Sequence, residues 1–134
     1  EAKEHISLIN ARVGRQAPEL LEVIKRDKLS VGDAPIIFNL GNNNTLTRTQ
    51  VADVFAEVAN QSQIIVVNTA VPRPWRDANN ALIAEYAAAN PRARVVDWAT
   101  ISQNHPEYFA PDGVHLRPAG ITVYVAAIME SLNK

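Results

Sequence analysis

An aspartate and a histidine, Asp112 and His115, form the sharpest chemical pair in the sequence, with Gly113 between them. At this spacing across a turn, the carboxylate can accept a hydrogen bond from the imidazole Nδ1–H. Nε2 is then free to act as a general base. A plain Pro-Asp-Gly surface turn before a helix contains the same residues, and so short a motif is weakly specific. Both interpretations stay open on these residues alone.

An asparagine-rich loop is the second candidate. Residues 41–44 read Gly-Asn-Asn-Asn and follow an apolar run over 36–40. Asparagine side chains can donate hydrogen bonds to an oxyanion that develops during a reaction. Asparagine also tolerates left-handed backbone geometry, so a purely structural loop is the alternative. Gly14 follows another apolar run, and it could either present its backbone N–H to an oxyanion or simply begin a loop.

Two further side chains lie beside these segments. Gln16 follows Gly14 closely and either supports a site or is solvated. Trp75 follows a third apolar run and could line a cleft, although a tryptophan there more often packs. The sequence has no cysteine and no histidine spacing typical of a metal site, and it has no glycine-rich phosphate loop. We therefore expect neither a metal nor a cofactor.

The composition fits a single domain over residues 1–134. The chain is 47% hydrophobic and carries a formal net charge of −1. A charge so close to zero gives no electrostatic case for nucleic acid as a partner. The longest apolar run, 123–129, is far shorter than the roughly 20 residues that a membrane span requires.

The elements that must position these residues alternate between strand and helix patterns. Short apolar runs predict strands over 7–11, 36–40, 64–68 and 94–96. Helical spacing predicts helices over 18–27, 47–59, 77–90 and 118–132. Such alternation is typical of a parallel sheet covered on both faces, a three-layer α/β/α sandwich. Ligands bind beyond the carboxyl ends of such strands, where the candidate residues fall.

Taken together, Gly14, Gly41-x-Asn43 and Asp112-x-x-His115 resemble blocks II, III and V of the SGNH (GDSL-like) hydrolase superfamily, in order and in strand placement. The sequence resembles one branch of this superfamily more closely. Segments 13–16, 71–75, 96–98 and 112–120 resemble the extracytoplasmic C-terminal domain of OatA-type peptidoglycan O-acetyltransferases. In that family the domain follows an integral-membrane acyltransferase-3 module.

The resemblance implies a flavodoxin-like parallel sheet and a role for each residue. His115 would be the general base and Asp112 the carboxylate that orients it. Asn43 and the Gly14 N–H would donate to the oxyanion, and Gln16 and Trp75 would contact substrate. The implied reaction moves an acetyl group from a donor to a serine and then to peptidoglycan, at the C6 hydroxyl of N-acetylmuramic acid. The implied location is the extracytoplasmic face of the bacterial membrane.

The Gly-Asp-Ser block that supplies the family's nucleophile is absent from the chain. In the family this block ends the first strand, which would lie upstream of Glu1. In a flavodoxin-like order that strand separates 7–11 from 36–40. Its loss would leave buried backbone groups unpaired, at about 1–3 kcal/mol each. We therefore expect a separate peptide or another copy to supply the missing strand, or the two strands to pair directly.

Three functions remain open. The first is O-acetyl transfer to a cell-surface polysaccharide, with the nucleophile upstream of this chain. The second is an SGNH carbohydrate esterase, in which water replaces the sugar as the acceptor. The third is a non-catalytic remnant that binds carbohydrate.

Overall fold

Four parallel strands form one sheet in the part of the chain that the computed structural model describes, residues 7–8, 20–26 and 32–133. The strands are β1 (Ser7–Leu8), β2 (Ile36–Asn39), β3 (Ile64–Val67) and β4 (Ala93–Val96), and they lie in this order. The helices are 20–26, α2 (Arg48–Val58), α3 (Arg76–Ala88), α4 (Trp98–Ile101) and α5 (Pro118–Leu132), with the 3-10 helix η2 at Pro106–Tyr108.

Alternate side chains of β3 enter two separate hydrophobic cores. Ile64 and Val66 pack into one core, and Ile65 and Val67 into the other. All four side chains are fully buried. Because successive side chains of a strand point to opposite faces, a strand buried throughout requires cover on both faces. The three-layer sandwich predicted from the sequence is confirmed.

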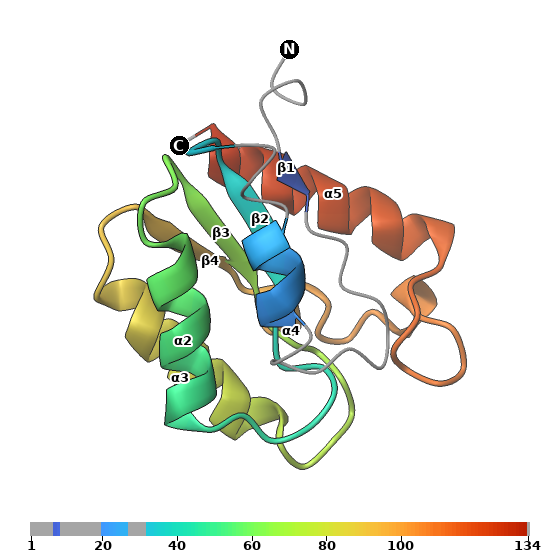
Figure 1. Cartoon of the computed structure of the whole chain (residues 1–134). Helices are drawn as coiled ribbons and strands as arrows, with labels where there is room; N and C mark the ends of the chain where they lie inside the picture. The colour runs from blue at the N-terminus through green and yellow to red at the C-terminus, as the bar shows by residue number, and fades with distance from the viewer. Residues whose placement is uncertain (1–6, 9–19, 27–31, 134) are drawn as a thin grey trace.

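The helices divide unevenly between the two faces. Helix 20–26, α2 and α3 contribute side chains to the first core, and α5 contributes to the second. Figure 1 shows α2 and α3 on one side of the sheet and α5 on the other. The uneven division follows from the strand order. Each helix that connects two successive parallel strands leads to the next strand in the same direction along the sheet. Connections of the same handedness then all lie on one face of the sheet.

The predicted elements agree closely with the observed ones. The strands predicted over 36–40, 64–68 and 94–96 differ from β2, β3 and β4 by one residue at one end. The start of α2 has a capping box. The Thr47 hydroxyl accepts from Gln50 N at 3.1 Å, and Thr47 N donates to Gln50 Oε1 at 3.0 Å. Only 7–8 of the strand predicted over 7–11 lies within the described residues.

The gap expected between the first two strands is closed. β1 pairs directly with β2 in parallel register, Ser7 opposite Ile36 and Leu8 opposite Ile37. Of the two arrangements expected, direct pairing is the one that this chain adopts. The expectation that another peptide or copy supplies the strand is wrong for this structure, because β1 itself occupies the edge of β2. Direct pairing satisfies the backbone groups that a gap would leave unpaired.

Two valines, one buried in the first core and one half-exposed, test whether the core is assigned correctly. Val54 of α2 is fully buried, whereas Val125 of α5 is 49% exposed. We expect Val54→Ala to lower the free energy of unfolding by about 2 kcal/mol, because it removes buried methyl groups and leaves a cavity. Val125→Ala should change it by less than about 0.5 kcal/mol. Urea denaturation measures both, and equal losses would contradict the assigned core.

Candidate active site at the carboxyl edge of the sheet

The predicted pair of Asp112 and His115 forms in the structure. Oδ2 of Asp112 contacts Nδ1 of His115. Oδ1 of the same carboxylate accepts hydrogen bonds from two backbone amides, those of Val114 at 2.8 Å and His115 at 3.0 Å. The contact through Nδ1 leaves Nε2 as the ring nitrogen that can exchange a proton with a substrate. The His115 side chain is 60% exposed, so small reactants can reach it.

Hydrogen bonds within residues 108–117 close this segment into a loop around the pair. We call this loop the ring. Ala110 N donates to His115 O at 2.8 Å, and Arg117 N donates to Tyr108 O at 2.8 Å. Between these bonds, Phe109 and Leu116 form an antiparallel bridge. Gly113, at the tip, has a φ of +73°, which favours glycine. These local hydrogen bonds therefore hold Asp112 and His115 within one short segment of the chain.

The ring rests on the second core through a cluster of aromatic side chains. Trp98, which is 3% exposed, lies 6.0 Å from Tyr108 and 6.1 Å from Phe109 between ring centroids. Tyr124 of α5 packs edge-on against Trp98 at 5.1 Å. Gly120 lets α5 approach the ring, since a Cβ there would lie 2.3 Å from Tyr108 O. Packing thus fixes the ring relative to the sheet.

Hydrogen bonding lowers the pKa of Asp112 to about 2. The backbone amide of Val114 contributes most, followed by the side chain and then the backbone of His115. All three stabilise the ionised carboxylate. The charged form therefore persists through the whole physiological range. It can therefore orient the imidazole, and it can stabilise an imidazolium cation whenever the imidazole takes up a proton.

The asparagine-rich loop after β2 is held by α3. Asn79, a fully buried residue, donates from Nδ2 to Gly41 O at 3.0 Å and to Asn44 O at 2.8 Å. Its Oδ1 accepts from Leu46 N at 2.9 Å. In the sequence, Asn43 lies between Gly41 and Asn44, the two residues whose carbonyl groups Asn79 binds. The loop that carries this predicted oxyanion donor is therefore fixed at both ends.

The loop after β3 is held in the same way by the next residue of α3. Asn80 Nδ2 donates to Thr69 O at 2.9 Å, and Asn80 Oδ1 accepts from Thr69 N at 3.0 Å. Farther along this loop, Pro72 packs against Gly113, where an added Cβ would lie 3.0 Å from Pro72 Cγ. The loops that follow β3 and β4 are thereby in contact.

Side-chain amides also link the strand ends themselves. Asn39 donates to Val67 O at 3.2 Å, and Asn68 donates to Asp97 Oδ1 at 2.9 Å. Partial burial raises the pKa of Asp97, but the hydrogen bonds from Asn68 and Thr100 outweigh it, so the net pKa is lowered. Asp97 thus remains an anion that caps α4 and anchors β3 to β4.

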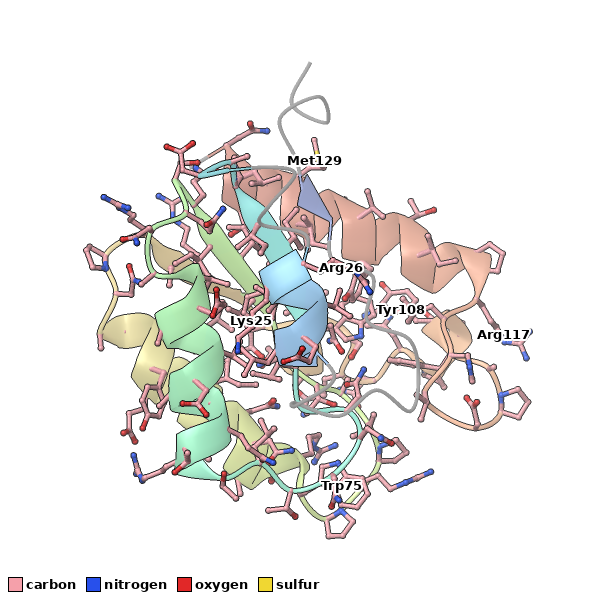
Figure 2. The ribbon with its side chains drawn as sticks, in the orientation of Figure 1. Lys25, Arg26, Trp75, Tyr108, Arg117 and Met129 are labelled. Carbon is pink, nitrogen blue, oxygen red and sulfur yellow. The ribbon has the colours of Figure 1, made fainter. Side chains whose placement is uncertain are left out.

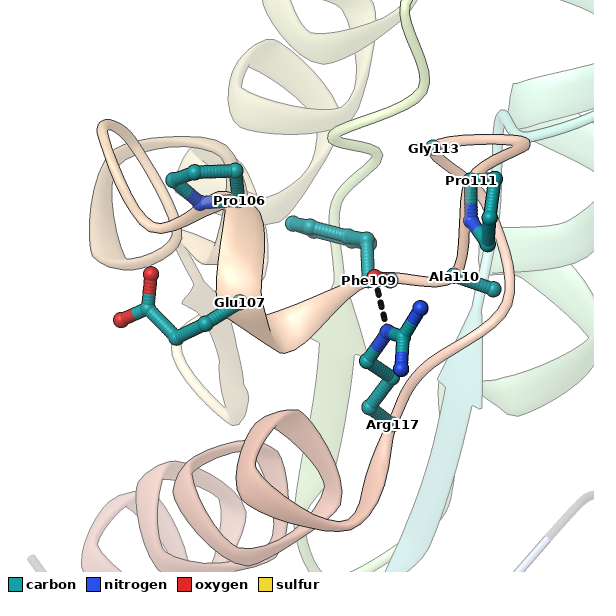
Figure 3. Close-up of a pocket in the computed structure, with 7 residues that line it drawn as sticks. All are labelled: Pro106, Glu107, Phe109, Ala110, Pro111, Gly113 and Arg117. Carbon is teal, nitrogen blue, oxygen red and sulfur yellow. Dashed lines mark hydrogen bonds between the residues drawn. The ribbon is translucent and has the colours of Figure 1, made fainter.

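A hollow of about 740 Å³ opens beside the ring (Figure 3). Pro106, Phe109 and Pro111 give it apolar walls, and Glu107 and Arg117 add charge. Arg117 Nε donates to Phe109 O at 2.8 Å, the dashed line in Figure 3. Figure 2 shows Arg117 projecting outward from the start of α5. The hollow offers both an apolar surface and polar groups next to the loop that holds His115.

No protein-family profile matches the chain. Peptidoglycan O-acetyltransferase OatA of Listeria monocytogenes is 38% identical over 127 residues, which cover 94% of this chain and 20% of OatA. YrhL of Bacillus subtilis, provisionally named for the same activity, is 35% identical over 126 residues, covering 93% of the chain and 20% of YrhL. A provisionally named O-acetyltransferase of Staphylococcus aureus strain COL is 34% identical over 130 residues, covering 96% of the chain and 21% of that protein.

Over nearly its whole length, the chain is therefore similar to part of these O-acetyltransferases, consistent with an OatA-type domain. It spans about a fifth of the length of the relatives it matches.

The structure brings some of the predicted site residues together. Asp112 and His115 are in contact, and Asn43 lies in a loop at the same edge of the sheet. Trp75 precedes α3 at this end of the molecule (Figure 2), and among the described residues its buried indole N–H has no hydrogen-bond partner. Gly14 and Gln16 lie outside the described residues.

Sequence reasoning missed Asn79 and Asn80. Two consecutive asparagines within a helix are a signal, since asparagine is a poor helix former whose side chain competes for backbone groups. Both carboxamides bind backbone groups outside their own helix. Within the described residues, no cluster of three or more histidine, aspartate or glutamate side chains could hold a metal ion. No helix in that part is long and apolar enough to cross a membrane.

The hydrogen bonds to Asp112 predict an acid-resistant carboxylate. Its pKa is lowered from 3.8 to about 2, so its interactions stabilise the loop above about pH 4 and are lost as the pH falls through about 2. We expect the Asp112 side-chain carbonyl carbon to titrate near pH 2 in NMR spectra. His115→Ala should raise this midpoint but leave it below 3.8, because the backbone amides remain. An ordinary midpoint in the unmodified protein would contradict the geometry.

Proposed function

We propose that this chain forms the acyl-transfer site of a peptidoglycan O-acetyltransferase of SGNH type, in which a serine carries the acetyl group as an ester intermediate. The contact between Asp112 and His115 is the observation that carries the proposal. The names of the relatives OatA and YrhL support peptidoglycan as the acceptor. The arrangement of loops at one sheet edge supports a shared site for base and oxyanion donor.

In the first half-reaction, His115 Nε2 takes the proton of the serine hydroxyl as the oxygen attacks the acetyl carbonyl carbon. The tetrahedral oxyanion accepts hydrogen bonds from Asn43 and from the Gly14 N–H. When the intermediate collapses, the proton passes from His115 to the leaving group of the donor. In the second half-reaction, the sugar hydroxyl gives its proton to His115 and attacks the acetyl-serine. The serine oxygen then leaves with that proton.

The serine comes from a segment N-terminal to this chain in the longer proteins. Three of the chain's serines have described surroundings, and none suits the role. Ser102 is 5% exposed and donates from Oγ to Trp98 O at 2.7 Å, and Ser131 is 8% exposed near the end of α5. Ser62 precedes β3, so it lies at the amino end of the sheet, away from His115. An upstream Gly-Asp-Ser segment, as in the family that the chain resembles, meets the requirement when its strand takes the place beside β2 that β1 occupies in this chain.

The acceptor sugar binds in the hollow beside the ring. Pyranose rings offer an apolar C–H face that suits the walls formed by Phe109 and the prolines, and their hydroxyl groups suit Arg117 and Glu107. Trp75 and Gln16 would contact the donor or the acceptor, as the resemblance implies. The same residues would make the protein an esterase if water displaced the sugar, and the 60% exposure of His115 favours this second activity.

The length of the relatives supports a further module in the proposed assembly. The chain covers 20% of OatA and of YrhL, which leaves room for a membrane-embedded acyltransferase-3 module upstream. In this proposal that module delivers the acetyl group. The site described here then faces the cell wall from the extracytoplasmic side of the membrane.

A transfer assay with an N-terminally extended protein tests the proposed function. An activated acetyl ester and a peptidoglycan oligosaccharide should yield acetylated sugar, which mass spectrometry detects. His115→Ala and Asp112→Asn should each lower kcat sharply, on the order of 10³–10⁴-fold. Asn43→Ala should lower it by about 10²–10³-fold. Free acetate as the sole product would favour the esterase, and full activity in Asn43→Ala would exclude its oxyanion role.

The acceptor site is tested separately through Arg117. We expect Arg117→Ala to raise the KM for the oligosaccharide about tenfold, since hydrogen bonds to charged groups contribute about 1.5–3 kcal/mol. The change in kcat should be smaller than the change in KM. Arg92→Ala removes the same charge just before β4, at the opposite edge of the sheet, and should leave KM unaltered. Equal KM values in all three proteins would place the acceptor elsewhere.

A further inference from the structure

The loop over residues 41–46 depends on α3 for its shape. Gly41 has a φ of +100° and Asn44 a φ of +144°, both in the region that ordinary side chains avoid. Within the described part of the chain, no backbone-to-backbone hydrogen bond joins this loop to another segment. The three bonds from the Asn79 carboxamide hold it instead. Asn42 Nδ2 also donates to Asn39 Oδ1 at 2.6 Å, but the bonds from Asn79 are the ones that bind the backbone groups of Gly41, Asn44 and Leu46.

The position of Asn79 suits it to this task. Its Nδ2 uses both N–H groups, one on Gly41 O and one on Asn44 O, while its Oδ1 accepts from Leu46 N. The bonded groups bracket Asn43 in the sequence. The loop also packs directly on the helix, since a Cβ at Gly41 would lie 3.4 Å from the Asn79 Cβ. A fully buried amide in such contact has little freedom to move.

Asn80 shows what the same residue type does one position later. Its carboxamide binds both backbone groups of Thr69, in the loop after β3. No hydrogen bond of Asn80 given by the structure reaches residues 41–46. The two asparagines therefore hold different loops, although they share a helix and a chemistry.

We propose that Asn79 is a positioning residue for Asn43. Its carboxamide fixes the loop so that the Asn43 amide stays where the oxyanion of the acyl-transfer reaction develops. The inference rests on the proposed function, because it gives Asn43 a role in catalysis. Asn79 itself touches no reacting atom. Its effect on the rate passes entirely through Asn43, which distinguishes it from a residue that only stabilises the fold.

A double-mutant cycle in the N-terminally extended protein tests this. The readout is kcat for release of the leaving group from an activated acetyl ester, measured below the lowest melting temperature of the set. We expect Asn79→Ala to lower kcat by about 10- to 100-fold in the otherwise unmodified protein. In the Asn43→Ala background the same change should cost less than about threefold, because the donor that it positions is already gone.

Asn80→Ala is the matched control, since it removes the same carboxamide from the same helix. Asn80→Ala should lower kcat by the same factor in the otherwise unmodified protein and in the Asn43→Ala background. If Asn79→Ala fails to fold, Asn79→Ser takes its place, because a hydroxyl can still bond one loop carbonyl. We expect Asn79→Ser to give an intermediate loss of kcat that again nearly disappears in the Asn43→Ala background.

The outcomes separate this inference from the proposed function. An active protein in which the Asn79 and Asn43 losses multiply would overturn the positioning role and leave the function standing. So would an Asn79→Ala protein with unchanged kcat. An extended protein that neither transfers nor hydrolyses acetyl would overturn the proposed function, and the positioning role with it.

Discussion

The burial of β3 on both faces is the constraint on which the rest of the structure depends. Its four side chains are fully buried and alternate between two cores, so the fold must supply helices on both sides. Its register also aligns its neighbours, because Val67 lies opposite Asn39 of β2 and Val96 of β4. Three strands therefore end level, and the loops that follow them emerge side by side. The candidate site exists because these three ends coincide.

Side-chain amides then convert a shared edge into a defined geometry. Parallel strands leave their loops without a ladder of backbone hydrogen bonds, and carboxamides fill that role because each can donate and accept. Asn39 and Asn68 link the strand ends, and Asn79 and Asn80 hold the loops from α3. None of these groups is charged, so they order the edge without altering its electrostatic balance. The carboxylate of Asp112 is left to act on His115.

The sequence predicts what is local and leaves out what is distant. The run 64–68 predicts a strand, because a short run of apolar, β-branched side chains favours a strand covered on both faces over a helix. The Asp112–His115 contact is predictable since its partners are close in the chain. The bonds of Asn79 are not, because its partners lie 33–38 residues away. α4 and η2 are too short to show a helical period. Direct pairing of β1 with β2 is one of two arrangements that the sequence allows.

The closed ring over residues 108–117 makes one half of the site self-contained. Its hydrogen bonds begin and end within ten residues, at the junction of η2 and α5. The asparagine-rich loop is shaped instead from across the fold. Substitutions of Asn79 can therefore alter the asparagine-rich loop while leaving the Asp112–His115 contact intact, and substitutions in the ring can do the reverse. Remodelling of the ring's outer wall would leave the asparagine-rich loop unchanged, which gives this small fold two separately evolvable parts.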